Sequence, residues 1–316
     1  MSNFLFSINV TIPIFLVMVV GYFLRRIHIL NDNFVSVANK LCFTVTLPVL
    51  VYRDLASVNI LEIFDWKYVI FCAVATSAGF WGSWIIAKIF LKDHSMRGAF
   101  TQAAFRSSAA VMGLAFIENI YGASAMGSLM IIGAVPLYNI YSVIVLTFEG
   151  DYPEGERDTG RIRSAGLNII TNPIIIGIII GIVVALFGNP LPELVNSTVD
   201  YIARCATPLA LLTLGAGFEG RKALAKIKPT IGASIIKLVG MAACFIPLAA
   251  YFGFTGEKMV ALLVMLAGPA TPSCYIMAVE MHNDGELTAS IVVATTLLAS
   301  VTLTAWIFIL RTVGWI

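Results

Sequence analysis

Hydrophobic residues along this chain fall into ten long segments that are separated by short polar stretches. Each segment is 21 to 28 residues long and mostly apolar, which is long enough for an α-helix to cross a bilayer. The pattern therefore predicts an all-α integral membrane protein with ten transmembrane helices, over residues 4–24, 36–56, 67–91, 98–121, 123–148, 166–187, 191–218, 229–252, 258–281 and 287–311.

The ninth segment, residues 258–281, has an unusual centre. The six positions 268–273 hold two prolines, a glycine and two hydroxyl residues: Gly268, Pro269, Thr271, Pro272 and Ser273. Each proline lacks a backbone N–H and clashes with the preceding turn, so nearby carbonyls lose their helical partners at a depth without water. A simple proline kink filled by neighbouring helices is the alternative. Two prolines with Gly, Thr and Ser favour a broken helix that builds a binding site.

The chain divides into two related halves. A polar, Gly-rich linker at residues 151–165 separates a first half, 1–150, from a second, 166–316. A displacement of 160 positions brings several residues of the first half onto identical residues of the second: Thr11 and Thr171, Pro13 and Pro173, Ile14 and Ile174, Gly21 and Gly181, and Pro48 and Pro208. Because each half has five helices, related halves must insert with opposite topologies. The sequence thus predicts two inverted five-helix repeats, an architecture typical of secondary transporters.

Composition agrees with the membrane assignment. The chain is 59% hydrophobic and only 12% charged, whereas soluble domains are about one quarter charged. Twenty Lys and Arg balance eighteen Asp and Glu, so no basic face for nucleic acid is expected.

The placement of the positive charges predicts the orientation. The loops after the first, third, fifth and seventh helices carry far more Lys and Arg than the opposite loops, which hold only Arg53, Lys67, Lys258 and Arg311. Cytoplasmic loops carry such an excess. We therefore expect the central linker in the cytoplasm and both termini outside, in the cell membrane.

The same displacement relates the broken part of the ninth helix to residues 108–113 of the fourth. Two half-broken helices that meet at mid-membrane present opposed helix N-termini, whose free N–H groups favour an anion. An anionic cargo is therefore expected.

Five stretches carry a resemblance to a known family: TLPVLVYRDL in the second helix, FRSSAAVMGLAFIENIYG in the fourth, VPLYNIYSVIVLTFE in the fifth, ATPLALLTLGAGF in the seventh and AGPATPSCYIMAVE in the ninth. Together they resemble the auxin efflux carrier family, which includes the plant PIN exporters and bacterial malate and malonate carriers, within the bile acid, arsenite and riboflavin transporter superfamily. The chain differs from the family where Ser108 and Ala115 replace a common asparagine and proline.

The resemblance implies a fold in which helices 4 and 9 cross, as in sodium/bile-acid symporters and NhaA-type antiporters. It further implies a scaffold of helices 1, 2, 6 and 7, a transport domain of helices 3–5 and 8–10, an elevator mechanism, and often a homodimer. Substrate would bind at the crossing.

The candidate substrate site comprises Arg106, Ser107, Ser108, Met112, Gly113, Tyr138, Asn139, Gly268, Pro269, Ala270, Thr271, Pro272, Ser273 and Cys274. Arg106 either binds a substrate carboxylate or extends to the cytoplasmic interface. Lys237 has the same two interpretations, as a group in the transport-domain core or an interfacial one. Arg53 and Asp54 either pair or gate entry, and Arg204 has the spacing to pair with Asp200.

Three classes of function were weighed. A secondary active or facilitative transporter of small organic anions, whether dicarboxylates or auxin-like acids, fits best. A sodium- or proton-coupled antiporter or symporter of the same fold is the alternative. A membrane-embedded enzyme is disfavoured because His28, His94 and His282 are all expected in loops and no HExxH motif is present. No metal, cofactor or nucleic-acid partner is expected; the partners are the organic anion, the bilayer and a second copy of the chain.

Overall fold

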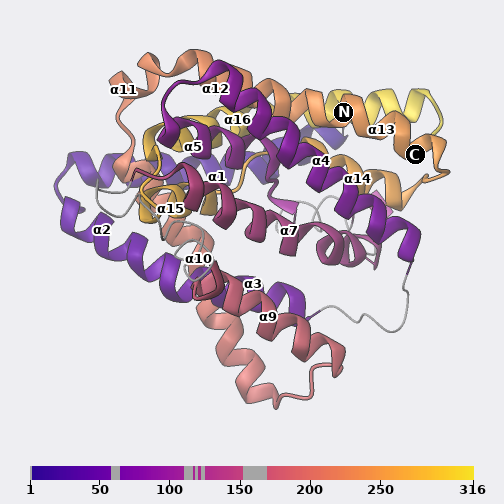
Figure 1. Ribbon diagram of the computed structural model, residues 1–316, viewed down its shortest axis with the longest axis horizontal. Helices are drawn as coiled ribbons and strands as arrows, with labels where there is room; N and C mark the ends of the chain where they lie inside the picture. The colour runs from indigo at the N-terminus through magenta and orange to yellow at the C-terminus, as the bar shows by residue number, and fades with distance from the viewer. Residues whose placement is uncertain (1, 58–64, 110–116, 118–119, 122–124, 152–168) are drawn as a thin grey trace, which may run out of the picture.

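The protein is helical throughout the part that the structure describes. The computed structural model describes residues 2–57, 65–109, 117, 120–121, 125–151 and 169–316, and within these ranges it has no strand (Figure 1). Its α-helices are α1 Ser2–Arg26, α2 Asp32–Leu41, α3 Leu47–Ala56, α4 Trp66–Phe90, α5 His94–Phe105, α7 Ala125–Glu149, α9 Pro173–Leu186, α10 Glu193–Gly217, α11 Gly220–Ala225, α12 Ile227–Ile235, α13 Met241–Tyr251, α14 Glu257–Ala267, α15 Ser273–Glu280 and α16 Gly285–Thr312. Two π-helical segments, η1 Cys42–Thr46 and η3 Ile236–Gly240, join α2 to α3 and α12 to α13.

Several of these helices fit a bilayer. Among the described residues, five stretches are long and apolar enough to cross a membrane, at 32–56, 66–90, 129–149, 227–251 and 285–312. The shorter helix α9 is also apolar. The prediction of an all-helical membrane protein is confirmed at this level.

Polar side chains cap the starts of helices α5 and α9. Helix α5 begins at His94 and not at residue 98, since the Asp93 carboxylate accepts from Ser95 N at 2.9 Å. His94 is therefore helical, and its predicted loop position was wrong. Residues 166–168 lie outside the described residues, and residues 169–170 are helical. Helix α9 begins at Pro173, because Asn172 Oδ1 accepts from Ile174 N at 2.9 Å and proline suits the first helical position.

The π-helical segment η1 ends at Thr46, two residues before Pro48. Proline cannot donate to the carbonyl four residues back and its ring crowds that carbonyl. The wider π turn, in which Leu47 N donates to Cys42 O, carries the helix past this position without a break.

Two pairs of helices approach each other most closely at glycines. Helix α1 packs on α10, and α3 packs on α9. A Cβ added to Gly21 would meet Leu212 O, and one added to Gly181 would lie 3.0 Å from Tyr52 O. These two contacts are related residue by residue by the same displacement of 160 positions that relates the halves of the sequence.

The remaining helices surround α14. Helices α4, α5 and α7 pack together, α16 contacts α5, α12 and α15, and α14 lies against α7, α13 and α16. Every residue of α14 from Met259 to Ala267 is fully buried, so this half-helix forms the centre of the core. Figure 1 shows α9 and the start of α10 extending away from the other helices at the lower edge of the view.

Polar contacts gather at two ends of the bundle. At one end, which we call the linker end, Asp151 N donates to His282 O at 2.8 Å, Asp284 N donates to Ser95 O at 3.3 Å, and Lys226 pairs with Asp284 at 2.5 Å. These contacts join the ends of the predicted third, fifth, seventh and ninth helices, or the loops that follow them. Helices that cross a membrane in alternating directions would place these four ends on the same side.

The opposite end holds the start of α4 and the ends of α13 and α16. Lys258 pairs with Asp65 at 2.6 Å, and Gly256 N donates to Trp315 O at 2.9 Å. Which end faces the cytoplasm stays a prediction from the charge distribution.

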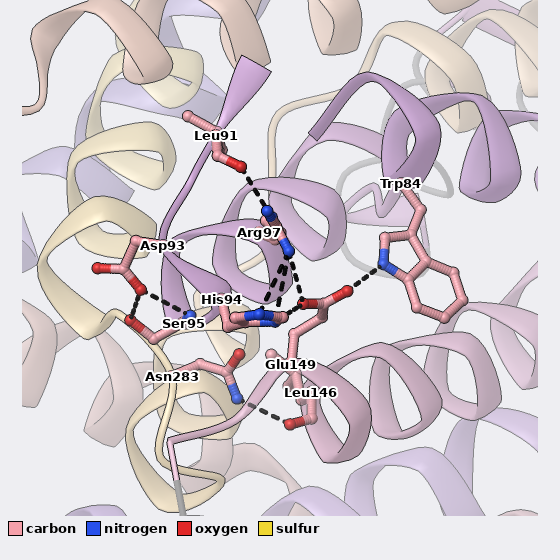
Figure 2. A network of polar contacts seen from close by, with 9 residues as sticks. All are labelled: Trp84, Leu91, Asp93, His94, Ser95, Arg97, Leu146, Glu149 and Asn283. Carbon is pink, nitrogen blue, oxygen red and sulfur yellow. Dashed lines mark hydrogen bonds and ion pairs between the residues drawn. The ribbon is translucent and has the colours of Figure 1, made fainter. Parts of the chain in front are cut away.

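A buried carboxylate organises the linker end. Figure 2 shows Glu149, the last residue of α7, accepting from Trp84 Nε1 of α4 at 2.7 Å and contacting His94 Nδ1 of α5 at 2.7 Å. Arg97 lies 4.0 Å from the same carboxylate, and Asn283 donates to Leu146 O at 2.9 Å. These bonds tie α4, α5, α7 and the α15–α16 connection into one unit.

Candidate functional site

The predicted break in the ninth helix is confirmed. Helix α14 ends at Ala267, helix α15 begins at Ser273, and residues 268–272 between them are not helical. Gly268 has an extended backbone, with φ −67° and ψ 154°. Both prolines and Gly268 lie in this interval, as the local chemistry of proline requires.

Carbonyls of the last turn of α14 accept hydrogen bonds from side chains of other elements. Val264 O accepts from Ser107 Oγ at 2.9 Å, and Met265 O accepts from Tyr138 Oη at 2.9 Å. Lys237 Nζ donates to Met265 O at 3.3 Å and to Leu266 O at 3.0 Å. The C-terminal end of α14 is therefore satisfied within the protein, as a membrane interior demands.

A second interruption meets the first. Helix α5 ends at Phe105, and residues 106–108 are not helical. Ser108 N donates to Pro269 O at 3.0 Å, so the two interrupted segments contact each other directly. Residues 110–116 lie outside the described residues, and with them Met112, Gly113 and the predicted second helix N-terminus.

Residues within the break also form contacts with other elements. Ala270 N donates to Thr295 Oγ1 of α16 at 3.1 Å. A Cβ at Gly268 would lie 2.5 Å from Ser107 Oγ and would also meet Val264 O, so only glycine fits between the two segments. The crossing is thus fixed by contacts on several sides.

A cavity of about 50 Å³ opens beside this crossing. Its walls come from α3, α7, α9 and α10 and from both interruptions: Leu47, Leu50, Val51, Asp54, Arg106, Ser107, Ser108, Ala109, Val135, Tyr138, Asn139, Ile174, Ala206, Thr207, Ala210, Thr271 and Ser273. A space of this size holds a few water molecules or a small ligand.

Arg106 is the cation of the cavity wall. It is only 6% exposed, which makes the interfacial alternative wrong. Its Nη1 contacts Met277 Sδ, a weak acceptor, at 3.0 Å, and its contact with Ser142 Oγ is long, at 3.5 Å. Among the described residues no carboxylate pairs with Arg106, although buried charges are normally paired.

Polar groups of the other walls complement this charge. Asn139 is 1% exposed and donates through Nδ2 to Val135 O at 2.9 Å, while its Oδ1 has no partner among the described residues. Thr271 Oγ1 and Ser273 Oγ lie 3.2 Å apart at the start of α15, whose N-terminal end adjoins the cavity. Tyr138 lines the cavity while bonding Met265 O.

The other predicted site residues of the break lie away from the cavity wall. Gly268, Pro269, Ala270, Pro272 and Cys274 are buried and shape the interruption, and the cavity lining does not include them. They contribute backbone geometry.

Lys237 lies at the crossing but does not line the cavity. It is fully buried in η3, so its interfacial alternative is wrong too.

The charged residues of α3 and α10 form one chain of ion pairs. Arg53 lies 2.8 Å from Asp54 and 3.2 Å from Asp200, and Arg204 lies 2.6 Å from Asp200. The predicted pairing of Arg204 with Asp200 is confirmed, and Arg53 and Asp54 do pair. Asp54 also lines the cavity, so a gating role for this pair stays a prediction.

Sequence reasoning missed several wall residues. Thr207 precedes Pro208 in an apolar helix, and this polar residue beside a proline was an available signal. Thr295 does not line the cavity, but its contact with Ala270 N was missed as well, although it adjoins Thr296 in a similarly apolar segment. The aliphatic positions of α3 and α9 carried no signal that separates cavity lining from ordinary packing.

Comparison with known proteins identifies the class. Residues 6–307 match the model of a family described as membrane transport protein. An uncharacterized transporter of Methanothermobacter thermautotrophicus is 18% identical over 310 residues, which is 97% of this chain and 99% of its own. The uncharacterized transporter YfdV of Escherichia coli K12 is 22% identical over 222 residues, 69% of this chain and 70% of its own.

The family match covers nearly the whole chain and includes both interrupted segments, and it indicates a transporter and not an enzyme. This chain therefore belongs to the auxin efflux carrier family of membrane transport proteins.

Proposed function

We propose that the protein carries a small organic anion across the membrane, with the carboxylate bound by Arg106 in the cavity beside the crossing. The observation that carries this proposal is a buried arginine without a carboxylate partner among the described residues, in the wall of a cavity between two interrupted helices. An unpaired buried charge is costly, and a bound carboxylate would neutralise it.

The guanidinium suits this role. It presents donors in a planar fork that matches a carboxylate, and such charge-assisted pairs are the stronger hydrogen bonds of proteins. The start of α15, with Thr271 and Ser273, adds the partial positive charge of a helix N-terminus to the same cavity. Both features favour an anion over a neutral or cationic solute.

The volume of the cavity and the charges of its wall limit the range of acids that we propose as substrates. The cavity of about 50 Å³ suits a compact carboxylate better than a large aromatic acid in this conformation. Asp54 is already paired with Arg53, so Arg106 supplies the one uncompensated charge of the described wall. We therefore favour a small carboxylate with one or two acid groups.

The proposed architecture is the ten-helix fold with inverted repeats. Its support is the matched pair of glycine contacts, Gly21 with Leu212 and Gly181 with Tyr52, which a twofold relation between the halves would produce. The cavity lies where α3, α9 and α10 face α5, α7 and α15. Sliding of these two groups past each other would expose it alternately, as an elevator mechanism requires. A homodimer remains part of the prediction.

Direct binding to purified protein tests the proposal. The probes are acetate, lactate, malonate, malate and indole-3-acetate, each measured on the wild type and on Arg106→Gln and Arg106→Lys. The Gln variant should bind about tenfold to a hundredfold more weakly, because a charge-assisted hydrogen bond contributes about 1.5 to 3 kcal/mol. The Lys variant should lose less, since it keeps the charge without the fork.

Arg204→Gln is the matched control, because Arg204 is 72% exposed and does not line the cavity. It should bind like the wild type. A folded Arg106→Gln variant with unchanged affinity for every acid that the wild type binds would exclude Arg106 from the site and remove the main support for an anionic cargo.

A further inference from the structure

A second buried cation lies at the crossing, and the anion site does not use it. Lys237 is 0% exposed in the π-helical segment η3. Its Nζ lies 3.4 Å from Phe105 O, 3.3 Å from Met265 O and 3.0 Å from Leu266 O. No carboxylate pairs with it among the described residues.

The three carbonyls have a common origin. Phe105 is the last residue of α5, and Met265 and Leu266 belong to the last turn of α14. They are the C-terminal ends of two half-helices, where unpaired carbonyls and the macrodipole concentrate negative partial charge. Two such ends converge on one point in the core.

The chemistry of this point matches a bound cation. In transporters with interrupted helices, unwound carbonyls and half-helix C-termini commonly coordinate the coupling ion. Here an ammonium with three N–H donors meets three carbonyl oxygens, so its donors are all used. Its Nζ occupies the position among the three oxygens that a coupling ion would take.

We propose that Lys237 is a resident cation that takes the place of a coupling ion at the crossing, so that anion transport by this protein needs no Na⁺ there. The structural part, a fixed ammonium that holds two half-helix ends together, stands without the proposed function. Only the consequence for transport rests on it.

Thermal unfolding of purified protein tests the structural part without any substrate. The wild type, Lys237→Met and Lys237→Ala are heated in equal concentrations of NaCl and choline chloride, with and without ethylammonium. The wild type should melt at the same temperature in both salts. Both variants should melt lower, because the carbonyls of Phe105 and Leu266 lose their donor.

Lys237→Ala leaves a space that a small cation can enter. Its melting temperature should rise saturably with Na⁺ or ethylammonium, as ligand binding to the folded state requires. Lys237→Met fills the space and should not respond. Leu238→Ala is the matched control, since this neighbouring residue is equally buried and its loss should lower the melting temperature without any rescue by cations.

Uptake into liposomes tests the transport part. Wild-type uptake of any acid that the protein binds should be equal in Na⁺ and choline media. A wild type stabilised specifically by Na⁺, or a Lys237→Met variant that melts and transports like the wild type, would overturn the proposal. The wild-type measurement decides even if neither variant folds. Failure to find a transported acid would count against the proposed function. The thermal unfolding results would then still test whether Lys237 acts as a fixed cation between the two half-helix ends.

Discussion

The close approach of the two interrupted segments makes a quantitative prediction for Gly268→Ala. The backbone of Gly268, with φ −67° and ψ 154°, is one that alanine adopts without strain. The penalty must therefore come from the added methyl group alone. That group would lie 2.5 Å from Ser107 Oγ and would also crowd Val264 O.

Neither neighbour is free to move. Ser107 Oγ donates to Val264 O at 2.9 Å, and the same carbonyl accepts from Gly268 N at 2.9 Å. Inserting a methyl group into such a packed site costs about 1 to 3 kcal/mol. At about 2 to 4 °C per kcal/mol, the melting temperature should fall by roughly 2 to 12 °C.

The assay is thermal unfolding in detergent, with Gly82→Ala as the control. Gly82 lies inside α4, and a Cβ there meets nothing within 4 Å. Alanine in a helix interior should stabilise that variant by about 0.5 to 1 kcal/mol. The double variant Gly268→Ala with Ser107→Ala should recover part of the loss and no more, because Val264 O remains. An unchanged melting temperature for Gly268→Ala would show that the two segments are not in contact as described.

Three further predictions test other parts of the molecule. Thr295→Val should lower the free energy of unfolding by about 1 to 3 kcal/mol, because the buried Ala270 N–H loses its acceptor, and thermal unfolding measures it. The Lys258 ammonium beside Asp65 holds the pKa of that carboxyl below its usual range, so the pair stabilises the fold above the unfolded pKa of about 3.9, and this contribution is lost as the pH falls through the folded pKa. The melting temperature of Asp65→Asn should therefore fall less than that of the wild type as the pH is lowered. Equal falls in the two proteins would contradict the pairing. A cysteine placed at Thr159 in the linker should be inaccessible to an impermeant thiol reagent from outside intact cells, and labelling there would refute the predicted orientation.

The break at Gly268 was predictable because proline acts through its own covalent structure. Pro269 and Pro272 disrupt hydrogen bonding within one turn, whatever surrounds them. The interruption after Phe105 was harder to place, since residues 98–109 contain no proline that would mark the end of the helix. The direct bond from Ser108 N to Pro269 O depends on two segments far apart in the sequence.

The role of Lys237 shows what the sequence could not provide. A lysine in an apolar segment has the same pattern whether it extends to the interface or turns into the core. Its acceptor Phe105 O lies 132 positions away along the chain, so only packing decides the outcome. The same holds for Asp54, whose pairing with Arg53 was predictable from adjacency while its place in the cavity wall was not.

The glycine contacts between helices determine which substitutions the protein can tolerate. At Gly21, Gly177, Gly181 and Gly215, any side chain would meet a backbone carbonyl of the facing helix, which cannot rotate away. Many aliphatic residues of α1 and α9 are exposed, and we expect them to exchange for one another without loss. A systematic substitution scan of α1, α9 and α10 should therefore tolerate many changes at exposed positions and reject even alanine at these four glycines.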